Sequence, residues 1–305
     1  SYPGHAANVD ELLKRLDLAV ASAAECGPNQ MSVYDSNMHT QFVRRQSIAM
    51  YLQTALEKQE LEVRYRPTYC LKEGRFTRAD SYMRIFIQGI GLVGAAEFLP
   101  IAEDSGQIRA IGYYALDHAG SEFDSICIPV SPILLVQEDF IDQVKRVIET
   151  YRIPEGKLAL EVDDSALSSI YLNVNITMQE LYDMGVELVM NNFGSGCAPV
   201  TSILDLPVNT VKLERMFVWQ LETNPKSASI AGGLIQIAKE LGIHIIAEGV
   251  ETENQLNALN SYECEYQQGF YYAPTMEFDV LKKVLGTTLE ESRVTIEEEK
   301  LKMKR

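Results

Sequence analysis

The sequence lacks the features that mark membrane proteins, secreted proteins and small domains stabilised by a bound metal. No stretch approaches the roughly 20 uninterrupted apolar residues of a membrane-spanning helix, and the N-terminus has no basic region followed by an apolar run and a cleavage site. The five cysteines include no C-x-x-C pair, which disfavours a structural zinc site and a disulfide framework. They are Cys26, Cys70, Cys127, Cys197 and Cys264. We expect a folded cytoplasmic domain without membrane contact of its own.

Positive charge is also scarce. The chain has 27 Lys and Arg against 43 Asp and Glu, a formal net charge of -16. Binding to a phosphate backbone requires clustered cations that displace counterions, so we expect no nucleic-acid partner. An acidic balance also suits a site that gathers carboxylates around a cation, although a solvated acidic surface is the commoner cause.

What the sequence does contain is a regular alternation of short β-branched runs with longer amphipathic segments from residue 60 onward. This pattern is typical of strand, crossover helix and strand in a parallel sheet. The predicted strands include residues 158–162, 186–190, 209–213 and 244–247. A capping box at 177–180 predicts a helix that stops at Gly185, and another capping box lies at 252–255. A further helix over 230–241 has Gly242 as its C-terminal cap. We predict an α/β fold, a (β/α)₈ TIM-like barrel.

Polar residues lie at or near the C-terminal ends of these predicted strands. They are Glu161, Asn191, Asn192, Glu214, Glu248 and Gln268. A barrel of this type builds its active site at that end, so we expect these side chains to converge on one mouth. Any one of them alone could instead cap the next helix or meet solvent.

The flanks differ from the barrel pattern. Residues 1–40 hold one amphipathic helix pattern over 9–24 and a short extended run, too little to bury a core. Residues 287–305 form a charged, helical tail, expected to be solvated or frayed. We predict a barrel over residues 41–286 between these two segments.

Six segments resemble signature segments of the EAL family, in the family's order. They are LEVRYRP at 61–67, AEFLPIAE at 96–103, LE at 160–161, NNFGSG at 191–196, LPVNTVKL at 206–213 and AEGVET at 247–252. The resemblance covers roughly residues 45 to 285. It implies a barrel that hydrolyses cyclic di-GMP to the linear dinucleotide with two Mg²⁺ or Mn²⁺ ions, which require anionic oxygen ligands.

Several of the family's metal ligands are altered here. The Glu that the family carries in its name is shortened to Asp80, and its Asn ligand is replaced by Pro129. The pair of aspartates before Phe-Gly becomes Asn191 and Asn192. Four positions match the family's catalytic set, namely Glu161, Lys212, Glu248 and Gln268, while Glu214 stands where the family has Asp. We therefore predict a degenerate phosphodiesterase that is not an active enzyme and uses no cofactor.

The predicted nucleotide contacts are mixed. Arg84 matches a family arginine that contacts the ligand's phosphate, a task suited to a guanidinium. Arg66 replaces a family Gln, Cys197 and Ala198 replace Tyr-Ser, and Glu251 belongs to the same predicted mouth. Arg84 alone is also compatible with an ordinary surface role.

The first 35 residues resemble the last helix and strand of a GGDEF domain, through DELLKRLD at 10–17 and Tyr34 with Asp35. This implies a piece of a longer GGDEF-EAL protein, with any sensor or membrane anchor upstream. Three functions remain open: a silent receptor for cyclic di-GMP that also contacts a protein partner or a dimer mate, a weak metal-dependent phosphodiesterase, and a scaffold that binds no nucleotide.

Overall fold

The computed structural model describes residues 8–25, 29–122, 126–164, 172–196 and 199–303, so Cys26, Cys197 and Ala198 lie outside the described residues. The chain divides into two compact units. The first comprises Ser1–Glu60 and Ile85–Gln107, and the second comprises Leu61–Arg84 and Ile108–Arg305. The boundaries predicted near residues 40 and 287 stay predictions.

The first unit is mainly helical. It contains α1 (Val9–Glu25), α2 (Ser36–Ala55), β3 (Gly91–Gly94) and α3 (Ala95–Asp104). The helix predicted over 9–24 is therefore present. Asp35 begins α2, because its carboxylate accepts hydrogen bonds from the backbone N–H groups of Asn37 and Met38. Arg44 of α2 binds Glu97 of α3 through two nitrogen–oxygen contacts, which joins these helices.

The second unit holds a closed barrel of eight strands. The strands are β1 (Leu61–Cys70), β2 (Arg75–Ile87), β4 (Ile126–Pro129), β5 (Leu158–Asp163), β6 (Glu187–Phe193), β7 (Thr210–Leu213), β8 (His244–Glu248) and β9 (Tyr266–Gln268). Their order is β1-β9-β8-β7-β6-β5-β4-β2, and pairing of β1 with β2 closes the ring. The prediction of a TIM-like barrel is confirmed.

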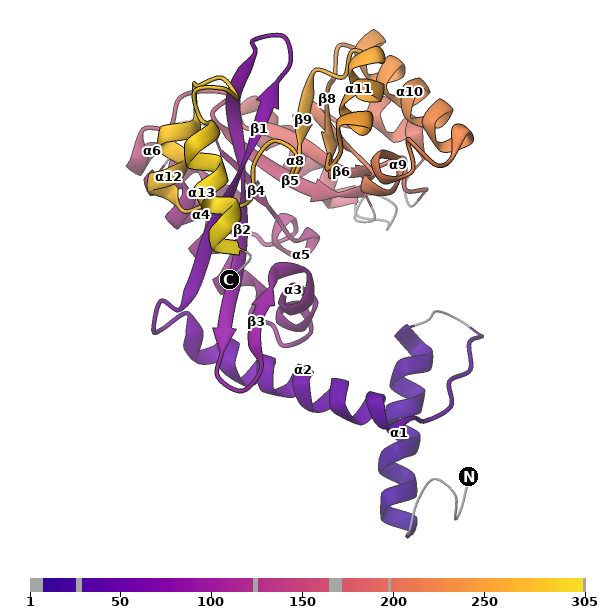
Figure 1. Ribbon diagram of the computed structural model, residues 1–305. Helices are drawn as coiled ribbons and strands as arrows, with labels where there is room; N and C mark the ends of the chain where they lie inside the picture. The colour runs from indigo at the N-terminus through magenta and orange to yellow at the C-terminus, as the bar shows by residue number, and fades with distance from the viewer. Residues whose placement is uncertain (1–7, 26–28, 123–125, 165–171, 197–198, 304–305) are drawn as a thin grey trace. The chain divides into compact units, whose positions relative to one another are not determined.

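One strand departs from the simple alternation. β1 pairs with β9 in the antiparallel sense, whereas the pairings from β2 through β4 to β9 are parallel. β1 and β2 are joined by a tight turn in which Gly74 has a φ of 68° and donates its N–H to the carbonyl of Cys70. So short a connection cannot contain a crossover helix, so the two strands run in opposite directions (Figure 1).

Helices follow the parallel strands. They are α4 (Ile108–Glu122), α5 (Pro132–Leu135), α6 (Phe140–Tyr151), α8 (Leu172–Asp183), α9 (Arg215–Trp219), α10 (Pro225–Glu240), α11 (Glu253–Ser261), α12 (Phe278–Val284) and α13 (Arg293–Met303), with a 3₁₀ turn η1 at Val200–Leu204. No helix of the described residues has both the length and the apolar character needed to cross a membrane.

The helix-end signals in the sequence were partly correct. Thr252 and Gln255 form the predicted capping box of α11, and Gly242 follows the end of α10 with a φ of 70°. The capping box predicted at residues 177–180 is wrong, because α8 already begins at Leu172 and Thr177 lies inside it. The hydroxyl of Thr177 instead donates to the carbonyl of Leu135.

The C-terminal segment is not the solvated or frayed tail that the sequence analysis expected. Ile296 and Glu299 of α13 are 2% and 3% exposed. Glu299 lies 3.6 Å from a guanidinium nitrogen of the buried Arg64 in β1 and also binds Lys302. Part of the charge that made this helix look exposed, on Glu299 and Lys302, is therefore paired within the helix or with the barrel.

Candidate active site

Lys212 is the centre of a polar network inside the barrel. Its side chain, on β7, is 1% exposed, and its ammonium lies 2.6 Å from the carboxylate of Asp80 on β2. It also binds Glu161 of β5 and lies 3.7 Å from Glu248 of β8. One buried cation therefore faces three carboxylates from three different strands.

Gln268 connects this network to β1. Its amide nitrogen donates to Asp80 at 2.9 Å and to the hydroxyl of Thr68 at 2.8 Å. The hydroxyl of Tyr82 lies 3.4 Å from both Gln268 and Glu248. Asp80 and Tyr82 face the same side because residues two apart on a strand share a face.

Glu248 has a second cationic partner. Arg215, at the start of α9, places a guanidinium nitrogen 3.2 Å from the Glu248 carboxylate and is 40% exposed along its side chain. Since Lys212 is fully enclosed and Arg215 is partly open, the two cations flank Glu248 from the interior and from the mouth.

The carboxylates of this network differ in proton affinity. Burial raises the pKa of Glu161 to about 7, with Asp80 and Glu248 adding to the rise and Lys212 opposing it. Burial acts the same way on Glu248, but Lys212, Arg215 and Arg66 outweigh it and hold its pKa below the usual value. Burial acts to lower the pKa of Lys212, yet the surrounding carboxylates keep it well above the usual value. Glu161 is therefore the group in this set that titrates near neutral pH.

The asparagine pair lies at the end of β6. Asn191 pairs in register with Asp163 of β5, and its side-chain oxygen accepts the backbone N–H of Asn192. The amide nitrogen of Asn192 donates to the Asp163 carboxylate. Asn192 has a φ of 57°, which bends the chain into the following loop. Both side chains act here as neutral amides in local hydrogen bonds.

Pro129 ends β4 in register with Glu161. Its ring offers no oxygen ligand, as the sequence analysis predicted, and it leaves Glu161 without a polar neighbour at this register position. Two residues earlier on β4, the Cys127 thiol lies 3.8 Å from Glu161. Burial raises the pKa of this thiol well above its usual value.

The residues predicted to contact the nucleotide differ in the partners that they have in the structure. Arg84 is bound through two contacts of 2.7 Å to Glu62. Arg66 lies over the ring of Tyr82 with 4.8 Å between guanidinium carbon and centroid, and its Nε is buried without a hydrogen-bond partner among the described residues. The exposed Glu251 makes a hydrogen bond to Gln255 through its backbone N–H. Glu214 caps α9, so for this residue the ordinary helix-capping alternative holds.

Asp80, Cys127 and Glu161 each offer one ligand atom, and these atoms lie within 4.8 Å of one another. The two carboxylates fit a hard divalent cation, while a thiol is a poor partner for Mg²⁺. The ammonium of Lys212 occupies hydrogen bonds to both carboxylates. The donor set therefore fits one divalent cation, which would compete with the ammonium of Lys212. Asn191 and Asn192 supply no anionic oxygen for a second metal ion.

Four members of the network were not predicted. Tyr82 and Thr68 could have been found from strand alternation, because they lie two residues from Asp80 and from Arg66. Cys127 lies two residues before Pro129 and shares its face by the same rule. Arg215 had no local signal, since its role depends on β7 and β8 being neighbours.

The chain is similar to known proteins over most of its length. The EAL domain family model matches residues 50–275. Signaling protein YkoW of Bacillus subtilis is 26% identical over 272 residues, covering 86% of this chain and 34% of that protein. Cyclic di-GMP phosphodiesterase NbdA of Pseudomonas aeruginosa is 26% identical over 297 residues, covering 93% of this chain and 38% of that protein. The chain thus spans about a third of the length of these curated relatives.

A solved structure supports the same relationship. The structure named PaMucR Phosphodiesterase, c-di-GMP complex, superimposes on this chain with a TM-score of 0.73 at 26% identity. MucR of Pseudomonas aeruginosa is also one of the curated relatives of this chain. The match covers 77% of this chain and 99% of that chain.

These matches correct one prediction. The sequence analysis predicted that the chain uses no cofactor, whereas the matched family uses Mg²⁺ or Mn²⁺. Asp80 and Glu161 remain as carboxylates for such an ion. Since the family model covers more than half of the sequence and the barrel has the same fold, the chain belongs to the EAL domain family of cyclic di-GMP phosphodiesterases.

Proposed function

We propose that this domain binds cyclic di-GMP as a receptor and hydrolyses it slowly or not at all. The nucleotide follows from the family and from the bound ligand named for the PaMucR structure. The reduced hydrolysis follows from the side chains at the barrel mouth. Binding and hydrolysis use different groups, so a domain can keep the first and lose the second.

The observation that carries the proposal is the neutral amide pair Asn191 and Asn192. Each keeps a carbonyl oxygen without charge, and the amide nitrogen of Asn192 donates to Asp163. One unit charge against a dication at about 4 Å contributes roughly 8 kcal/mol gross at an effective dielectric of about 20. Even when solvation offsets most of this energy, the loss of two charges lowers the affinity of a paired-metal centre for its ions by orders of magnitude.

Arg66 supports retention of the nucleotide. A buried guanidinium N–H without a partner is costly, and a phosphate oxygen at the mouth would satisfy it. Arg84 is the second candidate, but its two contacts to Glu62 must be shared or exchanged when a phosphate arrives. We therefore assign the larger share of phosphate binding to Arg66.

The test is isothermal titration with cyclic di-GMP, with and without Mg²⁺, on the wild type and on Arg66→Ala, Arg84→Ala and the control Arg146→Ala on the outer helix α6. We expect a Kd on the order of micromolar that changes little with Mg²⁺, weakened about tenfold or more by Arg66→Ala and less by Arg84→Ala. Absence of heat at millimolar nucleotide would overturn the receptor function and leave a protein scaffold.

A weak metal-dependent phosphodiesterase is the second candidate, favoured by the remaining Asp80 and Glu161 carboxylates. Hydrolysis of cyclic di-GMP in Mn²⁺ should be compared between the wild type, Glu248→Ala and the double variant Asn191→Asp/Asn192→Asp. If the first proposal holds, the wild type stays near the Glu248→Ala background and the double variant exceeds both. Wild-type turnover far above that background would establish the second candidate.

The proposal extends to the first 35 residues and to the longer protein. We infer that these residues are the end of a GGDEF domain whose remainder precedes this sequence, so ligand binding would be passed to neighbouring domains or to a dimer mate. Analytical ultracentrifugation of the longer protein with and without cyclic di-GMP tests this. Identical sedimentation and unchanged partner binding in both states would contradict it.

A further inference from the structure

A second cavity lies outside the polar network of Lys212. It has a volume of about 660 Å³ and is lined by the end of β1, the segment after β9, the segment before α13 and α13 itself. Volumes of this size are typical of sites for small organic ligands. None of the residues that surround Lys212 line it.

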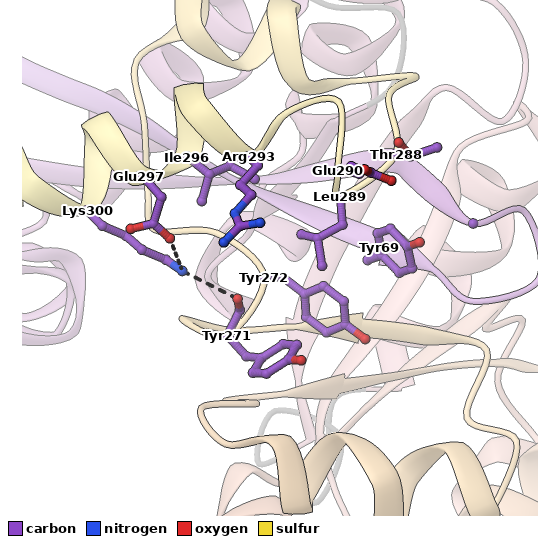
Figure 2. Close-up of a pocket in the computed structure, with 11 residues that line it drawn as sticks. Tyr69, Tyr271, Tyr272, Thr288, Leu289, Glu290, Arg293, Ile296, Glu297 and Lys300 are labelled. Atoms are coloured by element: carbon purple, nitrogen blue, oxygen red, sulfur yellow. Dashed lines mark hydrogen bonds and ion pairs between the residues drawn. The ribbon is translucent and has the colours of Figure 1, made fainter.

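Three tyrosines make one wall of this cavity (Figure 2). Tyr69 stacks on Tyr272 with 5.0 Å between ring centroids, and Tyr271 meets Tyr272 edge to face at 5.5 Å. Tyr272 is 2% exposed and its hydroxyl donates to Gln267 at 2.9 Å, so its ring is held in place. Tyr69 and Tyr271 are half-buried, and Leu289 adds aliphatic surface beside them. The wall is apolar, aromatic and rigid.

The polar side of the cavity carries a free cation. Among the residues drawn in Figure 2, the guanidinium of Arg293 makes no hydrogen bond or ion pair. The ammonium of Lys300 lies 3.7 Å from the Glu297 carboxylate and 3.5 Å from the carbonyl of Tyr271. The charges of Lys300 and Glu297 therefore compensate each other. Glu290 lies beside Thr288, on the side of the cavity where Tyr69 lies (Figure 2). Arg293 and Glu290 are therefore the two lining charges that no dashed line joins to another residue drawn in Figure 2, and Arg293 is the cation that an anion could bind.

We propose that this cavity is a binding site for a small planar aromatic anion. Its ring would lie against Tyr69, Tyr271 and Leu289, and its carboxylate or equivalent group would bind Arg293 through two parallel N–H contacts. Aromatic surface supplies the non-directional part of such binding, and the guanidinium fork supplies orientation. The site does not depend on the nucleotide function of the barrel.

The test uses 1-naphthoate as probe, with 1-naphthalenemethanol as the neutral ligand of the same ring and cyclohexanecarboxylate as the anion without an aromatic ring. We expect saturable binding of 1-naphthoate to the whole chain by isothermal titration, with a Kd on the order of 0.1–1 mM. Both control ligands should bind about tenfold more weakly or worse. Equal binding of the neutral ligand, or no binding of 1-naphthoate, overturns the proposal.

Matched variants locate the probe. Arg293→Gln should weaken 1-naphthoate about tenfold and leave 1-naphthalenemethanol unchanged, while Arg146→Gln on α6 changes neither. Tyr271→Leu should weaken both aromatic ligands, whereas Tyr182→Leu on α8 should not. Saturating cyclic di-GMP should leave 1-naphthoate bound, because the two sites share no residue. Displacement by cyclic di-GMP, or an unaltered Kd in Arg293→Gln, would place the probe elsewhere and refute this site.

Discussion

At the scale of single residues, the barrel interior depends on charge balance. Lys212, Arg66 and Arg215 face the carboxylates of Asp80, Glu161 and Glu248, so formal charges within the network cancel. Such a network is stable only when every member is present, because removing one partner leaves a buried charge without compensation.

Replacing Lys212 with Met should therefore destabilise the domain strongly. The change leaves Asp80 and Glu161 desolvated and without their shared cation, which costs about 3–5 kcal/mol in the free energy of unfolding. Urea unfolding in the presence of a chelator measures this. Lys283→Met, on the exposed side of α12, is the control and should change the value by less than about 0.5 kcal/mol. A Lys212→Met variant as stable as the control would contradict the charge-balance account.

Glu161 should give the unfolding free energy a specific pH dependence. Its pKa is raised from 4.5 to about 7 in the folded chain, so the folded state holds this proton more tightly than the unfolded state. The resulting stabilisation is complete below pH 4.5 and is lost as the pH rises through about 7. Relative to Glu161→Gln, the wild type should lose roughly 1–3 kcal/mol across this range.

The measurement is urea unfolding of both proteins at several pH values with a chelator present. Glu149→Gln, an exposed change on α6, is the control and should run parallel to the wild type. Parallel curves for wild type and Glu161→Gln would show that Glu161 keeps an ordinary pKa.

At the scale of elements, the position of Gln268 depends on how closely the segment after β9 approaches the end of β8. Val250 donates its N–H to the carbonyl of Gln268 at 3.0 Å, and Tyr271 donates to the carbonyl of Val250 at 2.9 Å. A Cβ on Gly269 would lie 2.2 Å from the carbonyl oxygen of Val250. Only glycine allows this approach.

Gly269→Ala should therefore separate the two segments. We expect a loss of about 1–3 kcal/mol in the free energy of unfolding, because backbone rather than a flexible side chain must move. Gly233→Ala in α10 is the matched control, since its Cβ would meet no atom within 4 Å. That change should be neutral or stabilise by up to about 1 kcal/mol. Similar stability of both variants in thermal unfolding would argue against the close approach.

At the scale of the whole molecule, the remaining carboxylates predict a weak response to metal. One cation bound at Asp80 and Glu161 with a Kd near the metal concentration stabilises the folded state by less than about 1 kcal/mol. Millimolar Mn²⁺ should therefore raise Tm by only about 1 °C over a chelator control. Asp80→Asn should abolish this rise and the exposed Asp279→Asn should keep it. A rise of ten degrees or more would mean that a strong metal centre survives.

Much of the barrel was predictable because its signals are local. The short apolar run that became β5 and the capping box of α11 each depend on a few neighbouring residues. The packing of α13 was not predictable, since its charged composition favours solvent until Arg64 of β1 provides a partner for Glu299. The reversed direction of β1 was missed for a similar reason: direction depends on the turn at Gly74 and on pairing with a strand almost 200 residues away.

The sequence by itself determined the family, the order of strands and helices, and the types of side chain available at the barrel mouth. These depend on periodicity and on residue identity, including the neutral amides of Asn191 and Asn192. Only the tertiary structure decided which of these groups bind one another. Lys212 contacts Asp80 across 132 positions of sequence, and Arg84 binds Glu62 instead of being free for a phosphate. Barrel closure sets such pairings, because it brings distant strand ends within hydrogen-bonding distance.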